Sequence, residues 1–166
     1  MDDIDNDNIK KVKSKLVNTN KNNKNLNLNI KDKDEYYSIY WAIDKNDIET
    51  VKLLIEYANQ NQIILKLNEK EENGWYPLLR AVNKNNTEIV KLLMEYANRH
   101  QIILKMNEKN KDEEYPIVWA TYNNNIEIVK LLIEYANQHQ IILELNKKII
   151  LDFFHFYKLF FGLVFK

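Results

Sequence analysis

The chain has 166 residues, a normal length for one domain. Its 24 acidic and 24 basic residues balance, so no net charge favours nucleic acid or an anionic membrane as a partner. The absence of cysteine excludes disulfides, zinc–thiolate sites and thiol nucleophiles. Only two glycines and two prolines occur, and this scarcity of turn residues favours a helical protein over a β-sandwich.

The N-terminal residues 1–8 are acidic and polar, without the basic and apolar regions of a signal peptide. We therefore expect an intracellular protein, located in the cytoplasm. Lysine outnumbers arginine by 22 to 2, and asparagine occurs 25 times. This is the bias of AT-rich coding sequence, so an isolated run of lysine or asparagine is interpreted as a solvated face.

An internal repeat organises the chain. The sequence Val-Lys-Leu-Leu begins at Val51, Val90 and Val129, in two steps of 39 residues. Three full units are predicted from this period, at residues 32–70, 71–109 and 110–148. A degraded copy at residues 1–31 is expected to be half a repeat that caps the array.

Each unit is predicted to contain two helices, of which the second has the clearer pattern. Apolar residues from Val51 to Ala58 recur at the spacing of one helical stripe. The pattern Asn-x-x-Glu, from Asn46 to Glu49 in the first unit, predicts an N-terminal capping box. The apolar residues 63–67 are expected to finish this helix and then run extended into the next turn.

The first helix of each unit is shorter. In the second unit it is predicted from Pro77 to about Asn83, because proline suits the first helical turn, where its missing amide would have no partner. Before it, Asn73-Gly74 predicts a tight turn, since glycine tolerates a positive φ. Units of this size cannot bury their own apolar faces, so we predict an all-α solenoid in which stacked neighbours complete the core.

The unit resembles an ankyrin repeat. The likeness rests on Tyr-Pro-Leu-Leu-Arg-Ala at residues 76–81 and on Glu-Ile-Val-Lys-Leu-Leu at residues 88–93, and it covers about residues 9–148. The family's usual Thr and His around Pro-Leu are absent. The period is 39 rather than ~33, so we expect a longer second helix or an enlarged loop after it. A HEAT-type solenoid is the alternative, and the Pro-Leu and Asn-Gly positions argue against it.

The resemblance implies that a partner protein binds to the turn tips and the exposed, concave side of the first helices. A comparison of the units indicates the same surface. Of 17 positions starting at Val51 and its equivalents, 12 are identical in all units, whereas among eight starting at Ser38 and its equivalents only the alanine is. Diversified positions suit a surface that matches an irregular partner, although drift of exposed positions would give the same contrast.

The predicted partner-binding residues lie on the first helices and at a turn tip. They are Trp41, Arg80, Trp119, Trp75, Asn83 and Tyr122. The first three share one repeat position, and Trp and Arg are enriched in binding hot spots. We expect that Arg80 could stack on either of the other two, as a ladder across the units. The alternative interpretation is that these rings only pack between adjacent repeats.

No catalytic residue, cofactor or metal site is predicted. His100 and His139 share a repeat position without companion ligands, so they are interpreted as polar helix-end residues. No nucleophile motif, phosphate-binding loop or recurring acid–base pair is present, so we do not expect an enzyme. Nucleic acid is not expected as a partner. The alternative to a protein-binding scaffold is a structural fragment of a longer repeat array, with no partner of its own.

The C-terminal residues 149–166 break the repeat pattern. From Ile149 to Phe165, 13 of 17 residues are apolar or aromatic. Three readings stay open: a capping helix, a membrane anchor, and translated non-coding sequence that ends a truncated gene. An anchor is disfavoured, because the segment is shorter than the ~20 residues of a span and contains Asp152 and Lys158. In each case we expect the aromatic surface to promote self-association.

Overall fold

The computed structural model describes residues 13–14, 16, 26–31 and 36–145. This part of the chain contains six α-helices: α2 (Ser38–Asp44), α3 (Ile48–Gln60), α4 (Pro77–Asn83), α5 (Thr87–Arg99), α6 (Pro116–Tyr122) and α7 (Ile126–Gln138). Short and long helices alternate, and each kind recurs in steps of 39 residues. The predicted all-α array of helix pairs is confirmed. The three readings of residues 149–166, and most of the expected half repeat at 1–31, lie outside the described residues.

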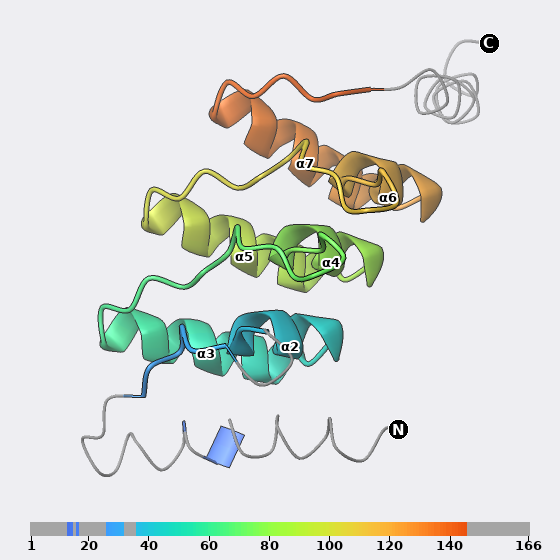
Figure 1. Ribbon diagram of the computed structural model, residues 1–166. Helices are drawn as coiled ribbons and strands as arrows, with labels where there is room; N and C mark the ends of the chain where they lie inside the picture. The colour runs from blue at the N-terminus through green and yellow to red at the C-terminus, as the bar shows by residue number, and fades with distance from the viewer. Residues whose placement is uncertain (1–12, 15, 17–25, 32–35, 146–166) are drawn as a thin grey trace, which may run out of the picture.

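The helix pairs stack as three layers (Figure 1). We call α2 with α3 the first layer, α4 with α5 the second, and α6 with α7 the third. The short helices contact one another along one column, α2 against α4 and α4 against α6, while α3, α5 and α7 form the other column. Each layer therefore covers the apolar face of the next, as the small size of one pair requires.

The core lies within and between these layers. The alanines at positions 42, 81 and 120 have no exposed surface, and they lie where the two helices of each layer pack together. The larger fully buried side chains come from both columns, among them Leu54, Leu78, Leu93 and Ile117. The apolar periodicity that predicted the helices is therefore the pattern that fills the core.

The predicted span of the short helix, Pro77 to Asn83, is confirmed. The helix stops because Asn85 adopts a left-handed conformation with φ 55°. The amide of Asn85 then donates to the carbonyl of Val82 at 2.9 Å, and that of Asn86 donates to Ala81 at 3.2 Å. These two bonds satisfy carbonyls that the helix end would leave free.

The capping-box prediction for the long helices is wrong by one residue. Their N-caps are Asp47, Asn86 and Asn125, each of which accepts a hydrogen bond from an amide three residues on. Asn46 instead has φ 56° and closes the short helix before it. Glu49 is thus the second helical residue rather than the third, so it cannot form the capping box. Its negative charge still stabilises the helix, because it lies at the positive end of the helix dipole.

The expectation that residues 63–67 finish the second helix is also wrong. α3 ends at Gln60, Gln62 adopts φ 56°, and the amide of Ile63 donates back to the carbonyl of Ala58 at 2.9 Å. This closing motif recurs after α5 and α7. Residues 61–76 then cross to the next layer without helix, so of the two alternatives for the long period the structure contains the enlarged loop.

Repeated side chains fasten these loops to the neighbouring layer. The side-chain amide of Asn68 donates to the carbonyl of Ile103 at 2.7 Å, and Asn107 makes the same bond to Ile142 one layer on. The described N-terminal residues follow the same pattern, since Asn29 donates to Ile64 at 2.7 Å. On the exposed side of the long helices, ion pairs between Lys52 and Glu88 and at the equivalent positions bridge the layers.

Among the described residues, no helix is both long enough and apolar enough to cross a membrane.

Candidate partner-binding face

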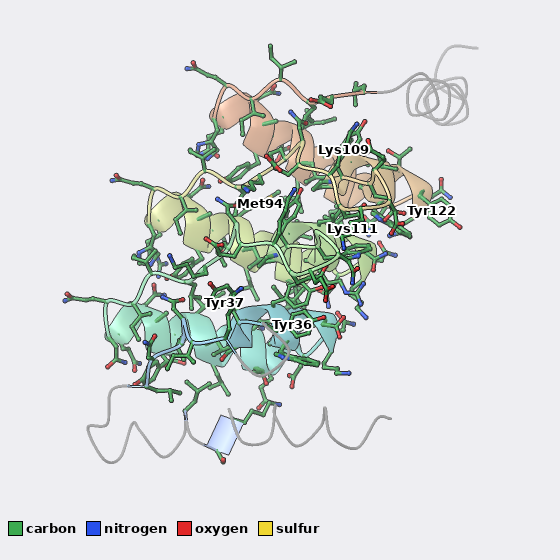
Figure 2. The ribbon with its side chains drawn as sticks, in the orientation of Figure 1. Tyr36, Tyr37, Met94, Lys109, Lys111 and Tyr122 are labelled. Carbon is green, nitrogen blue, oxygen red and sulfur yellow. The ribbon has the colours of Figure 1, made fainter. Side chains whose placement is uncertain are left out.

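The six predicted contact residues all belong to the short-helix column or to the turn before α4. Trp41, Arg80 and Trp119 occupy the fourth position of α2, α4 and α6, and each is partly exposed. Tyr122 is 72% exposed and projects outward from the end of α6 in Figure 2. We call this surface of short helices and turn tips the short-helix face.

Arg80 is held by an acidic residue of the first layer. Its Nε donates to Asp44 Oδ1 at 2.7 Å, and its Nη2 donates to the same oxygen. Lys84 approaches that oxygen at 3.6 Å, and Asn83 accepts from Arg80 Nη1 at 3.4 Å. The side chains of Arg80 and Asp44 are 25% and 19% exposed, so this pair is less screened by water than a surface ion pair.

Arg80 stacks on Trp75, whereas Trp41 or Trp119 was the expected partner. The guanidinium carbon lies 4.9 Å from the centroid of the Trp75 ring. The turn before α4 produces this contact, because Glu71 and Trp75 exchange two hydrogen bonds of 2.9 Å. The closed turn brings the indole back over the helix that follows it.

Aromatic contacts continue the arrangement into the third layer. The rings of Trp75 and Trp119 lie 6.3 Å apart, and Tyr122 meets Trp119 edge-on at 5.3 Å. The Nε1–H of Trp119 is buried without a hydrogen-bond acceptor, so packing alone orients this indole. Arg80, Trp75, Trp119 and Tyr122 therefore form one connected row across two layers.

In the first layer, Trp41 packs against Tyr36 with ring centroids 5.1 Å apart and carries the Lys45 ammonium 5.4 Å from its ring. Asp44, in the same helix as Trp41, connects this layer to Arg80 through their hydrogen bond. Sequence reasoning missed Asp44 and Tyr36. Both could have been found by the repeat register, because Asp44 occupies the position of Asn83 and Tyr122, and Tyr36 that of Trp75.

A small hollow lies between α2 and the loop before α4. Its lining includes Tyr36, Tyr37, Tyr40, Glu71 and Pro77. Burial raises the pKa of the Tyr40 hydroxyl, which therefore stays neutral at physiological pH. Glu69 and Lys70 complete its lining.

His100 and His139 lie at the C-caps of α5 and α7, as interpreted from the sequence. Their Nε2 atoms lie 2.7 Å from the side-chain oxygens of Asn59 and Asn98 in the layer below. Each thus links two layers. In the part of the chain that the structure describes, no three His, Cys, Asp or Glu side chains are grouped to hold a metal ion.

A family model of ankyrin repeats, in three copies, matches residues 4–102. The chain belongs to the ankyrin repeat family. This membership excludes the HEAT-type alternative. Ankyrin repeats generally mediate protein–protein interactions and are typically not enzymes. The match ends after α5, although α6 and α7 repeat the same helix pair. No curated protein sequence matches the chain.

Proposed function

We propose that this ankyrin repeat protein is a scaffold that binds a partner protein through the short-helix face. The observation that carries the proposal is the row of Arg80, Trp75, Trp119 and Tyr122, whose members contact one another and remain partly exposed. Trp, Tyr and Arg are the residues that dominate binding energy at protein interfaces. Trp41 extends the same surface into the first layer.

The arrangement of Arg80 supports this proposal. An arginine that must be immobilised on binding loses side-chain entropy, which weakens the complex. Here Asp44 and Trp75 already hold the guanidinium between them. The turn tips are fixed as well, because the amide of Lys111 donates to the carbonyl of Asn73 at 2.9 Å. A partner would therefore bind a surface whose side chains and turns lose little conformational entropy on binding.

The opposite column supports the proposal by contrast. Its exposed positions carry charged residues such as Glu56, Lys52 and Glu88, and the last two pair with each other. Such residues keep a helix solvated and contribute little to binding. A structural fragment with no partner, the alternative, would need only solvated residues on both columns. The 72% exposure of Tyr122 beside the Trp119 indole favours a binding surface.

The test is a pull-down with the native chain and with Trp41→Ala plus Trp119→Ala. Loss of the partners retained by the native chain supports the short-helix face. The matched control is Ile64→Ala plus Ile103→Ala, which removes apolar side chains that are 49% and 52% exposed on the loops after the long helices. Circular dichroism verifies that both variants are folded. An unchanged partner set in the tryptophan variant would refute the site.

The cytoplasmic location expected from the sequence stays a prediction, as does self-association through residues 149–166.

A further inference from the structure

Two of the three layers place a cation over an indole on the short-helix face. In the first layer the Lys45 ammonium lies 5.4 Å from the Trp41 ring, and in the second the Arg80 guanidinium lies 4.9 Å from the Trp75 ring. Such contacts are attractive because the electron-rich face of the ring faces the positive charge. A cation on an aromatic ring is therefore a recurring element of this surface.

The third layer has the rings without the cation. Trp119 and Tyr122 meet edge-on at 5.3 Å, and in the described residues no lysine or arginine lies over either ring. The repeat register explains why. The position of Lys45 and Lys84 is Asn123 in this layer, and α6 contains no basic residue. The exposed ring of Tyr122 can therefore be reached by a cation from outside the chain.

In the repeat register, a carboxylate holds the position that contacts the short helix in the first two layers. A tyrosine N-caps each short helix. In the first two layers, the residue before this tyrosine contacts the fourth residue of the helix: Tyr36 contacts Trp41, and Trp75 contacts Arg80. The same two positions hold Glu114 and Trp119 in the third layer. Glu114 is partly exposed and accepts one hydrogen bond, from Asn110 Nδ2 at 2.8 Å, which leaves acceptor capacity on its carboxylate.

The three residues that precede the short helix's N-cap tyrosine become acidic in the third layer. Residues 73–75 at the second tip are Asn-Gly-Trp, whereas residues 112–114 at the third tip are Asp-Glu-Glu. Lys109 pairs with Glu113 at 2.9 Å, so the other two carboxylates of this tip remain without a cationic partner among the described contacts. An acidic tip in the layer that carries the exposed Tyr122 ring is complementary to a basic side chain.

We infer that the third layer receives a lysine or arginine side chain of the bound protein, over Trp119 and Tyr122 and beside Glu114. The partner segment therefore carries a basic residue at this position. This inference rests on the proposed function, because it assigns the chemistry of the partner at one end of the same short-helix face. The partner's cation completes in the third layer the contact that Lys45 and Arg80 make within the chain in the other two.

The test uses random 12-residue peptides displayed on phage and selected on the full chain. The selected peptides are synthesised with each lysine or arginine in turn replaced by glutamine, and their affinities are measured by fluorescence polarisation. We expect one basic residue per peptide whose replacement weakens binding about tenfold, the scale of a good cation–π contact with a nearby carboxylate.

A double-mutant cycle locates that residue. In Tyr122→Leu and in Glu114→Gln, which change exposed or partly exposed side chains, the effect of the glutamine replacement should fall to less than about threefold. The matched control is Trp41→Leu, whose indole already carries Lys45. It lowers the affinity of all peptides but leaves the effect of the replacement near tenfold.

The possible outcomes separate this inference from the proposed function. Peptides that lose affinity with Trp41→Leu but do not depend on a basic residue would overturn the inference and leave the short-helix face as the binding site. Peptides that bind all three variants as tightly as the native chain would overturn both. A selection that yields no peptide would overturn the inference, and the pull-down would then decide the proposed function by itself.

Discussion

The hydroxyl of Tyr96 donates a hydrogen bond to the backbone carbonyl of Ile63 at 2.8 Å, and so ties α5 to the loop that leaves α3. The same oxygen accepts from the amide of Leu65 at 3.1 Å. One side chain thus satisfies two backbone groups of a loop that has no regular backbone hydrogen bonds. Tyr135 repeats both bonds one layer on, to Ile102 and Leu104.

Tyr96→Phe is predicted to lower the free energy of unfolding by about 1–3 kcal/mol, because it leaves two backbone groups without their partner in a buried place. Urea unfolding followed by circular dichroism measures the change. Tyr122→Phe is the control, because its ring is 72% exposed and should change stability by less than about 0.5 kcal/mol. Equal stability of the two variants would show that the Tyr96 hydroxyl does not hold the layers together.

Gly74 is required by the close approach of two turn tips. Its φ is 84°, and a Cβ added there would lie 2.9 Å from the Cα of Asn110 and 3.3 Å from the amide nitrogen of Lys111. Those atoms belong to the next tip, which the hydrogen bond from Lys111 to Asn73 draws in. Gly74→Ala is therefore predicted to cost about 2 kcal/mol or more, through backbone strain and a clash between main chains.

Glu113 provides the control for this prediction. It occupies the repeat position of Gly74, with φ 62°, but it already carries a Cβ. Glu113→Ala should cost much less than Gly74→Ala, because it removes only the exposed pair with Lys109. Thermal denaturation of the two alanine variants compares the sites directly. A Gly74→Ala protein as stable as Glu113→Ala would mean that the tips separate without penalty.

The sequence predicted those features of the fold that local chemistry determines. Pro77 and the apolar period defined α4, and Asn73-Gly74 defined its turn. The prediction failed where two neighbouring residues of the same type can both serve as the N-cap. Asn85 and Asn86 can each cap a helix, and only the closing motif of α4 decides that Asn85 is left-handed and Asn86 is the cap. The end of α3 was missed because glutamine, unlike glycine, does not signal a left-handed residue.

That left-handed glutamine leads to a stabilising substitution. Gln62 has φ 56°, a conformation that costs a residue with a Cβ roughly 1 kcal/mol and costs glycine almost nothing. Gln62→Gly is predicted to raise the free energy of unfolding by about 0.5–1 kcal/mol. Glu56→Gly, at an exposed position in the middle of α3, should lower it by a similar amount, because glycine is unfavourable within a helix. Urea denaturation of both variants would contradict this argument if the two changes had the same sign.

The candidate site was predictable in position but not in its pairings. The repeat register identified Trp41, Arg80 and Trp119 as equivalent, and all three lie on the short-helix column. The register could not show that Arg80 stacks on Trp75, because that contact depends on how the turn closes between Glu71 and Trp75. Contacts between residues at different repeat positions can be predicted only when the three-dimensional path of the loop is known.

Asp47 is the one acidic N-cap among the three long helices. Burial opposes ionisation of its carboxyl group, but hydrogen bonds from the Thr50 amide, the Lys13 ammonium and the Thr50 hydroxyl outweigh this effect and lower its pKa. A carboxyl group with a lowered pKa stabilises the folded state above its unfolded pKa of about 3.9, and this stabilisation is lost as the pH falls through the folded value. The equivalent caps Asn86 and Asn125 do not titrate.

Asp47→Asn is predicted to keep the cap and lose the pH dependence. At pH 7 the variant should be less stable than the native chain by up to about 1 kcal/mol, since the ion pair with Lys13 at 3.0 Å is partly exposed. The difference should begin to shrink near pH 4 and keep shrinking as the pH falls through the lowered pKa of the folded state, because the native carboxyl group is then becoming protonated. Urea denaturation at pH 7, 5, 4 and 3 measures it, with Lys13→Met removing the same pair from the other side. A difference that stays constant across this range would show that Asp47 stabilises α3 only through the cap, which asparagine supplies without charge.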